Sequence, residues 1–323
     1  MITLARSFKI VISMLRLTII GFGNQAKAWC QNLKDSGFSF RVALRPDSPS
    51  FHESLKQGFT TIDINSAALF DDRVFVLLIP DLAHAEVLEK YGKHFKPGST
   101  ILYNHGFSLI QNEFQIKYPD LNHVLYAVKS IGKEIRAQYL KKGRLGAVYS
   151  LEHFHANKLE FFSWINTLSL GLGVNLGPYQ TTFLHETQAD LFSEQGLLCS
   201  LIPYTASEVF SELVQNGIEP ELAYLECWEE LQLIVNAMVE MGPQRFYDMI
   251  SPNALVGSEK GFEKLFTPQF KSDLRSLFTD IKTKKFEQEL SHTDLQDVRS
   301  RISARWGSSP LVKTFNSINS GPK

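Results

Sequence analysis

Four carboxylates at regular spacing are the residues of this chain best suited to chemistry. Asp190 and Glu194 lie in one apolar segment, and Glu226 and Glu230 lie in a second. Residues four apart share one face of a helix, so each pair presents two acids together. The apolar flanks predict faces that are at least partly buried, and buried carboxylates need a cation. Mg²⁺ prefers oxygen ligands and suits two such pairs brought together. For either pair alone, the alternative interpretation is that the acids lie on a solvated edge of the helix.

A glycine-rich turn follows the apolar run LTII and precedes a predicted helix. It matches the pattern G-x-G-x-x-A and consists of Gly21, Phe22, Gly23, Asn24, Gln25 and Ala26. In this setting Gly21 permits the tight turn and Gly23 lets the backbone approach a pyrophosphate, which the helix N-terminus attracts. The loop therefore predicts dinucleotide binding, with a plain strand-to-helix turn as the alternative.

The second predicted strand, FRVAL, ends where the adenosine ribose of a dinucleotide would lie. Arg45, Ser48 and Ser50 follow this strand. A guanidinium and two hydroxyls suit a 2′-phosphate, so the sequence favours NADPH over NADH. Asp47 in the same loop works against this preference, and a solvated turn is the alternative interpretation.

The chain has two halves with different patterning. Short apolar runs alternate with helix-length segments in the first half, at LTII, FRVAL, VFVLLI, STILY, HVLYAV and GAVYSL. This alternation is typical of a parallel sheet covered on both faces. After about Thr181 the pattern becomes helical, and Gly217 and Gly242 are expected to end helices. We therefore predict an α/β, doubly wound, Rossmann-type domain over residues 1–180 and an all-α domain over residues 181–323.

The composition argues against nucleic acid and membranes as binding partners. The 323 residues carry 33 basic and 34 acidic side chains, a formal charge of −1 that gives no field to attract nucleic acid or an anionic membrane. No run of about eighteen apolar residues predicts a membrane span. Cys30, Cys199 and Cys227 show no CxxC spacing, which favours reduced core thiols in a cytoplasmic protein without zinc. The N-terminal residues predict no signal peptide, and Met14 is a second candidate, beside Met1, for the natural start.

Taken together, these segments resemble the ketol-acid reductoisomerase (acetohydroxyacid isomeroreductase) family. The resemblance rests on Ile20–Gln25, Asn32–Gly37, Leu44–Pro46, His105–Phe107, Thr181–Phe183, Asp190–Gln195, Ala223–Cys227 and Ile250–Ser251. The length fits the short, class I form of the family. Its all-helical C-terminal domain is knotted and pairs with a second subunit, so the resemblance implies a homodimer or higher homo-oligomer.

The resemblance also implies a reaction and its ligands. Two Mg²⁺ ions would be held by Asp190, Glu194, Glu226 and Glu230, and NADPH would be the reductant. The implied activity is alkyl migration in 2-acetolactate or 2-aceto-2-hydroxybutanoate, followed by reduction to a 2,3-dihydroxy acid in valine and isoleucine synthesis. Glu230 and Ser251 would contact this 2-acetohydroxy acid substrate.

The resemblance implies three catalytic residues, which are Glu194, His105 and Lys129. His105 follows a predicted strand in YNHGF, at the edge where open α/β sheets bind ligands, although a lone histidine is usually structural. Lys129, in AVKSIG, corresponds to a family lysine in a proton relay, and a solvated lysine is the alternative.

Among the chain's departures from the family, two affect the expected cofactor loop and substrate pocket. The segment 127–133 reads AVKSIGK where the family usually has APKGPGH, and Pro252–Asn253 replaces Asp-Thr. Loss of two prolines and a glycine predicts a loop of different shape or mobility. Two alternatives therefore stay open, an NADPH-dependent reductase of another 2-keto acid and a non-catalytic cofactor-binding or interaction protein.

Overall fold

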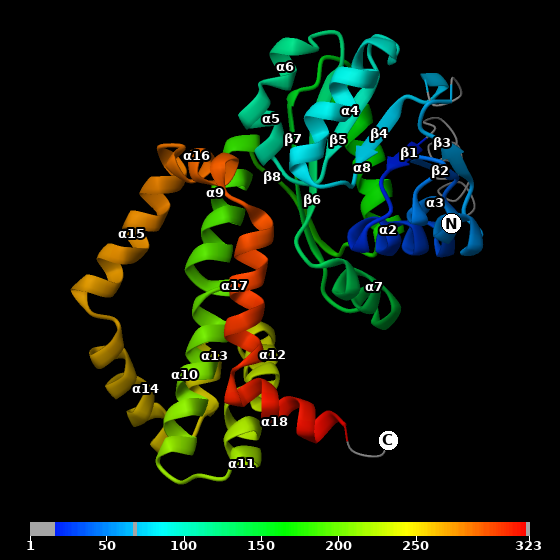
Figure 1. Cartoon of the computed structure of the whole chain (residues 1–323). Coiled ribbons are helices and arrows are strands. Elements are labelled where there is room, and N and C mark those ends of the chain that lie inside the picture. The colour runs from blue at the N-terminus through cyan, green and yellow to red at the C-terminus, as the bar shows by residue number, and fades with distance from the viewer. Residues whose placement is uncertain (1–16, 67–69, 321–323) are drawn as a thin grey trace. The chain divides into compact units, whose positions relative to one another are not determined.

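The structure, a computed structural model, describes residues 17–66 and 70–320. The interpretation of the N-terminal sixteen residues, including the choice between Met1 and Met14, lies outside the described residues. The chain divides into two compact units, residues 1–187 and 188–323. Each unit is described by itself (Figure 1).

Unit 1 is built on an eight-stranded sheet with the strand order β3-β2-β1-β4-β5-β6-β7-β8. The strands are β1 (Leu17–Ile20), β2 (Phe40–Leu44), β3 (Thr61–Asp63), β4 (Val74–Leu77), β5 (Thr100–Tyr103), β6 (Asn122–Val128), β7 (Gly146–His153) and β8 (Leu176–Gln180). β1, β4 and β5 are buried along their whole length, which explains their continuous apolar sequences.

The predicted strands are present, with two additions and one change of direction. β3 and β8 were not predicted because Thr61–Asp63 is very short and the LGPYQ sequence of β8 contains glycine and proline. Six of the seven neighbouring strand pairs are parallel as expected. β7 runs antiparallel to β6, so the prediction of a wholly parallel sheet is wrong there. The doubly wound α/β class is confirmed.

Helices cover both faces of the sheet, each over its own apolar core (Figure 1). One core includes side chains from α2 (Asn24–Asp35), α7 (Gly132–Lys141) and α8 (Lys158–Leu172), with Phe51 of α3 (Pro49–Lys56) at its margin. The other includes side chains from α4 (His84–Tyr91), α5 (Phe107–Asn112) and α6 (Phe114–Lys117). Short turns η2 (Asp81–Ala83) and η3 (Gly92–His94) flank α4.

A buried histidine in β6 makes the stability of this unit sensitive to acid. His123 is fully buried; its Nδ1 lies 3.0 Å from the Tyr103 hydroxyl and its Nε2 lies 3.2 Å from the Tyr118 carbonyl. The carbonyl accepts only, so Nε2 carries the proton and Nδ1 accepts from Tyr103. Burial, with the nearby His153 and His155, lowers the pKa of His123 from 6.5 to about 4.

We expect the free energy of unfolding to fall as the pH drops from 6.5 toward 4. In this window the unfolded chain binds a proton at His123 that the folded chain excludes, which costs about 2 kcal/mol at pH 5. Urea unfolding at pH 7 and pH 5 measures the change. His123→Gln should reduce this difference by about 2 kcal/mol, whereas the same substitution at the exposed His52 should keep it. Equal pH dependence in both variants would contradict the assignment.

Unit 2 is helical, as predicted. Its helices are the end of α9 (Phe183–Ser193), the π-helix η4 (Glu194–Leu198), α10 (Leu201–Gln215), α11 (Pro220–Tyr224), the π-helix η5 (Leu225–Glu229), α12 (Glu230–Met241), α13 (Pro243–Met249), α14 (Pro252–Leu265), α15 (Pro268–Lys282), α16 (Lys285–His292), α17 (Leu295–Gly307) and α18 (Pro310–Asn319). Gly217 and Gly242 follow α10 and α12 with positive φ angles, which confirms the predicted helix ends. The knot implied by the resemblance stays a prediction.

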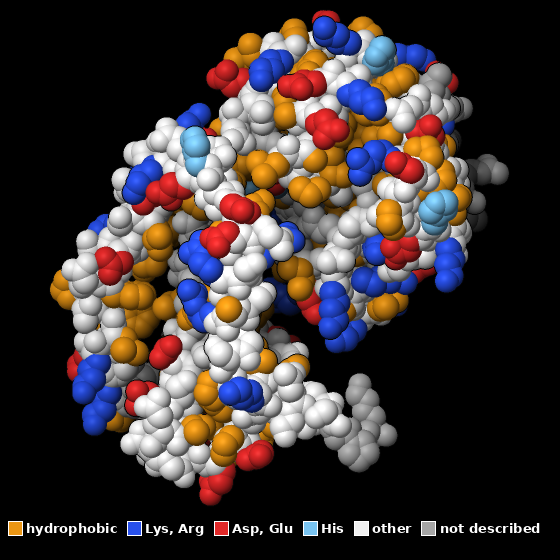
Figure 2. Space-filling view, in the orientation of Figure 1, with side chains coloured by type: hydrophobic (Ala, Val, Ile, Leu, Met, Phe, Trp, Pro, Cys, Tyr) orange, Lys and Arg blue, Asp and Glu red, His pale blue; other side chains and the backbone are white. Residues whose placement is uncertain are grey.

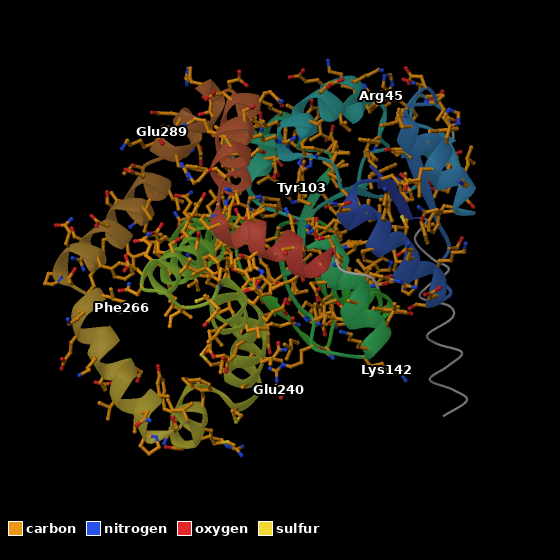
Figure 3. The ribbon with its side chains drawn as sticks, turned by 60° about the horizontal axis from the view of Figure 1, so that its bottom comes forward. Arg45, Tyr103, Lys142, Glu240, Phe266 and Glu289 are labelled. Atoms are coloured by element: carbon orange, nitrogen blue, oxygen red, sulfur yellow. The ribbon has the colours of Figure 1, made fainter. Side chains whose placement is uncertain are left out.

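The core of unit 2 is small. Its buried apolar cluster consists of Phe210, Ala223, Tyr224, Cys227 and Leu311. Many large apolar side chains stay exposed instead, and Figure 2 shows apolar surface over α14 and α15. Phe266, labelled in Figure 3, is 44% exposed between these two helices. An exposed apolar surface of this extent is typical of a binding face.

Two other expectations for this unit need correction or qualification. Cys30 and Cys227 are buried as predicted, but Cys199 is exposed beyond the end of η4. The helical stretch 183–215 meets the length and composition criteria for a membrane span, unlike the prediction from sequence. It carries Glu186, Asp190 and Glu194, and one such helix is weak support for a membrane protein.

Candidate functional site

The glycine turn connects β1 to α2 and has the geometry that the motif requires. Gly21 has a φ of +113°, and a Cβ there would lie 2.3 Å from the carbonyl oxygen of Leu78. Gly23 has nothing within 4 Å of its Cβ position, and it precedes α2 with no side chain capping the helix. The first turn of α2 has no side-chain cap, so its N–H groups can bind a pyrophosphate.

Two cavities lie along the carboxyl ends of the strands in unit 1. One, of about 380 Å³, is bordered by Gly21, Phe22 and Gly23 and by the residues after β2, including Arg45, Ser48 and Ser50. The other, of about 260 Å³, shares Gly23 and is bordered by Asn24, Gln25, Asp81, Asn104 and His105. The predicted cofactor residues and His105 thus border two cavities that share Gly23 and Leu78–Pro80, and a dinucleotide fits their chemistry.

The residues predicted to contact the adenosine ribose include the expected hydrogen-bond donors, although one of them, Ser48, also caps a helix. Arg45 is exposed at the end of β2 (Figure 3). Ser48 caps α3, since its Oγ accepts from the Phe51 N–H and donates to the Arg45 carbonyl oxygen. Lys90 of α4, which the sequence analysis missed, borders the same cavity. The cavity therefore offers two cations to a phosphate.

Gln25 joins the glycine turn to the divergent loop. Its amide nitrogen donates to the Ser130 carbonyl oxygen at 3.3 Å, and its amide oxygen accepts from Asn104 at 2.8 Å. Gly132 lies so close to the turn that a Cβ there would be 2.3 Å from the Asn24 carbonyl oxygen. The segment 127–133 thus packs on the cofactor turn despite its altered sequence, with Ile131 69% exposed.

A buried glutamate links the two predicted catalytic residues of unit 1. Glu186, in the first turn of α9, has a side chain only 1% exposed. One of its oxygens lies 2.5 Å from Lys129 Nζ, and the other accepts from the Gly106 N–H at 2.7 Å and lies 3.9 Å from His105 Nε2. His105 and Lys129 therefore meet around one carboxylate that was not predicted. The sequence feature that could have revealed Glu186 is its position one helical turn before Asp190.

We expect Gly106→Ala to disturb this cluster. A Cβ at Gly106 would lie 2.6 Å from the Phe183 carbonyl oxygen and 2.6 Å from Thr187 Oγ1, so α9 must move away from β5. The bond to Glu186 would lengthen and Lys129 would lose its fixed position. Turnover should fall by about 10- to 100-fold, because displacement of a catalytic group by about 1 Å has effects of that size.

Steady-state kinetics of purified Gly106→Ala against the parent chain measures this loss. Gly257→Ala is the matched control, because nothing lies within 4 Å of its Cβ position in α14. Unchanged turnover in Gly106→Ala would contradict the role of this close approach.

The four predicted metal ligands all lie in unit 2. Asp190 is in the last turns of α9, Glu194 begins η4, Glu226 is in η5 and Glu230 begins α12. Asp190 is half-buried, but Glu194, Glu226 and Glu230 are exposed. The expectation of partly buried acids is therefore wrong for three of the four in the single chain. Several apolar neighbours, such as Leu198, Leu225 and Leu233, are exposed too. Carboxylate oxygens suit Mg²⁺.

Both acid pairs coincide with π-helices. η4 begins at Glu194, and η5 contains Glu226 and ends directly before Glu230. A π-helix is rare and is frequently found at functional sites. The sequence pattern gave no sign of these π-helices, and they favour function over a plain solvated edge.

Ser251, predicted to contact substrate, also caps a helix. Its Oγ accepts from the Ala254 N–H at 3.2 Å at the start of α14. Accepting this bond leaves the hydroxyl proton available to donate to an oxygen of a ligand. Pro252 is the first residue of α14, a position where proline is favoured.

Comparison with known families matches both halves of the chain. Residues 11–171 match the acetohydroxy acid isomeroreductase NADPH-binding domain, and residues 183–314 match the ketol-acid reductoisomerase C-terminal domain. The chain belongs to the ketol-acid reductoisomerase family, which consists of oxidoreductases. A family member from Methanococcus maripaludis strain C5, named ketol-acid reductoisomerase (NADP(+)), is 32% identical over 291 residues, which cover 88% of this chain and 87% of the relative.

Solved structures support the same fold. An NADH-preferring ketol-acid reductoisomerase from an uncultured archean has a TM-score of 0.84 at 23% identity, covering 97% of this chain and 96% of that one. A pyrroline-5-carboxylate reductase from Coxiella burnetii has a TM-score of 0.62 at 14% identity over 84% of this chain and 98% of that one. At these identities the likeness concerns the fold alone.

Proposed function

We propose that this member of the ketol-acid reductoisomerase family catalyses the NADPH-dependent isomeroreduction of 2-acetohydroxy acids with Mg²⁺. The substrates would be 2-acetolactate and 2-aceto-2-hydroxybutanoate, converted to 2,3-dihydroxy acids in branched-chain amino-acid synthesis. The observation that carries the proposal is that one acid of each pair, Glu194 and Glu226, lies in a π-helix inside the segment that matches the family's C-terminal domain. Residues 1–180 would bind the cofactor, and residues 181–323 would carry the metal ligands.

Asp190, Glu194, Glu226 and Glu230 are the residues that would hold two Mg²⁺ ions, with Asp190 between them. When bound, Mg²⁺ supplies polarisation of the substrate carbonyl and NADPH supplies a hydride. Glu230 would also accept a hydrogen bond from a substrate hydroxyl. Glu194, with its two carboxylate oxygens, would position the substrate beside the metals.

The side chains of unit 1 would handle protons and orientation. Lys129 lies beside the carboxylate of Glu186 and can donate a proton to a substrate oxygen. His105 borders the cavity that also contains Asn24 and Gln25, so it would lie near the nicotinamide. Ser251 would donate its free hydroxyl proton to the substrate.

We expect Arg45→Ala to weaken NADPH much more than NADH. Arg45 and Lys90 are the cations bordering the cavity, and only NADPH has the 2′-phosphate that they would contact. Loss of one charge-assisted hydrogen bond costs about 1.5–3 kcal/mol, so the KM for NADPH should rise by about 10-fold or more. The KM for NADH in the same variant is the internal control; an equal rise for both cofactors would contradict the assignment.

A homodimer or higher homo-oligomer is part of the proposal. Unit 2 has a core of few buried residues and exposes large apolar side chains, among them Leu233, Met249 and Leu265. A second copy would cover such surface and bring the exposed acids into a drier site. This arrangement supports a soluble enzyme, which we propose to be cytoplasmic, rather than a membrane protein.

The proposal is tested by following NADPH oxidation with Mg²⁺ on two substrates. 2-Acetolactate requires migration and reduction, whereas 3-hydroxy-3-methyl-2-oxobutanoate requires reduction only. Turnover of both is expected. Turnover of the second alone would indicate a reductase without the isomerase step, and tight NADPH binding without turnover of either would indicate a specialised relative; either result contradicts the proposal.

A further inference from the structure

His105 is held at three points within unit 1. Its Nδ1 lies 3.2 Å from Asp81 Oδ2, and its Nε2 lies 3.9 Å from Glu186 Oε2. Its ring is stacked on Phe107, with ring centroids 6.0 Å apart and an interplanar angle of 8°. The two ring nitrogens therefore face two different carboxylates, and the stacked ring fixes the plane in which they point.

Asp81 is itself held in a defined position. It begins the turn η2 after Pro80, and its Oδ1 lies 3.8 Å from Nδ1 of His84. His84 is buried; its Nε2 lies 3.1 Å from the Ile79 carbonyl oxygen and its Nδ1 lies 2.6 Å from Ser108 Oγ. Because the carbonyl can only accept, Nε2 carries the proton of a neutral His84. His84 is thus a rigid neighbour of Asp81.

The electrostatics agree with a charged Asp81. Burial works to raise the pKa of Asp81, but the hydrogen bond and charge of His105, with smaller contributions from His84 and Ser108, lower it below its ordinary value. Burial lowers the pKa of His84, so that histidine stays neutral. An ionised carboxylate can only accept, and the atom that donates to it is Nδ1–H of His105.

We propose that Asp81 is a positioning residue for His105. By accepting from Nδ1–H, Asp81 keeps a proton on that nitrogen and leaves Nε2, which faces Glu186 and the site around it, as the nitrogen that takes or gives a proton there. A carboxylate in this arrangement also stabilises the imidazolium that forms when Nε2 takes a proton. The role rests on the proposed function, because it requires His105 to face the substrate.

Asp81 lies outside the segments that carry the family resemblance. It lies 24 residues before His105, on the loop after β4, and both residues border the cavity that contains Gly23. Parallel neighbours β4 and β5 end at the same edge of the sheet, which explains why residues so far apart in sequence meet.

The tautomer of His105 can be measured directly. The full chain is labelled with ¹⁵N-histidine and saturated with NADPH and Mg²⁺, and long-range ¹H–¹⁵N spectra are recorded at pH 8. The His105 signal is assigned as the one lost in His105→Gln among the nine histidines. We expect the proton on Nδ1 in the parent chain; a proton on Nε2 would overturn the proposal without any variant of Asp81.

Asp81→Asn then tests the role of the carboxylate. The asparagine amide can donate to Nδ1, so the proton of His105 should move to Nε2 and kcat should fall by about 100-fold or more. The KM for NADPH should change by less than about threefold, since Asp81 acts through His105. Asp71→Asn is the matched control, because Asp71 is exposed and paired with Lys96.

The outcomes separate this proposal from the proposed function. An unchanged tautomer in Asp81→Asn, or an unchanged kcat despite a changed tautomer, would overturn the positioning role. If the parent chain does not turn over 2-acetolactate, the proposed function fails, and the tautomer in the parent chain still decides whether Asp81 orients His105.

Discussion

Asp190→Asn is expected to abolish turnover of 2-acetolactate, with a loss of at least about 10³-fold. The proposal places Asp190 between two Mg²⁺ ions, and an amide has neither the charge nor the second anionic oxygen to do so. Metal polarisation of a carbonyl is worth several kcal/mol, and each 1.4 kcal/mol corresponds to a factor of ten in rate.

Calorimetric titration with Mg²⁺ provides a readout that does not depend on turnover. The parent chain is expected to show two binding events, and Asp190→Asn should lose at least one of them. Asp297→Asn is the matched control in the same unit, because Asp297 is exposed and pairs only at the surface with Arg301. Unchanged migration in Asp190→Asn would show that the bridging assignment is wrong.

Alanine at the two glycines of the cofactor turn should have two distinguishable effects. Gly21→Ala would place a Cβ 2.3 Å from the Leu78 carbonyl oxygen at a φ of +113°, so the fold itself must shift. We expect the free energy of unfolding to fall by about 2 kcal/mol or more and NADPH binding to be lost. Gly23→Ala has no neighbour within 4 Å and should fold normally.

Gly23→Ala should nonetheless weaken NADPH by about 10- to 100-fold. Its methyl group would occupy the space through which a pyrophosphate approaches the N–H groups of α2, and lost hydrogen bonds to a charged group cost about 1.5–3 kcal/mol. Urea unfolding and fluorescence titration with NADPH measure the two effects separately. Tight NADPH binding by Gly23→Ala would contradict placement of the pyrophosphate at this turn.

Sequence alone predicted the elements of unit 1 well because their physical signals are local. Continuous apolar runs such as LTII and FRVAL became β1 and β2 at the expected residues. The antiparallel direction of β7 was not predictable in this way, because a buried strand has the same apolar run in either direction. Direction depends on how the chain returns through α7, which is a tertiary property.

The sequence predicted the glycines and acids of the candidate site, but not the contacts that its residues make with distant segments. Glu186 looked like an ordinary helical acid until α9 packed beside the end of β5, where Gly106 and Lys129 contact it. The π-helices η4 and η5 could not be predicted either. Each is only five residues long, which is too short to produce a recognisable hydrophobic period in the sequence. Contacts between distant segments set both features.

Proton NMR of the product formed from 2-acetolactate tests the central claim most directly. Migration followed by reduction moves the methyl group to the neighbouring carbon and gives 2,3-dihydroxy-3-methylbutanoate, whose two methyl groups appear as singlets. The account predicts these two singlets when the chain, NADPH and Mg²⁺ are incubated with 2-acetolactate. A methyl doublet, from reduction of the ketone without migration to 2,3-dihydroxy-2-methylbutanoate, would contradict it.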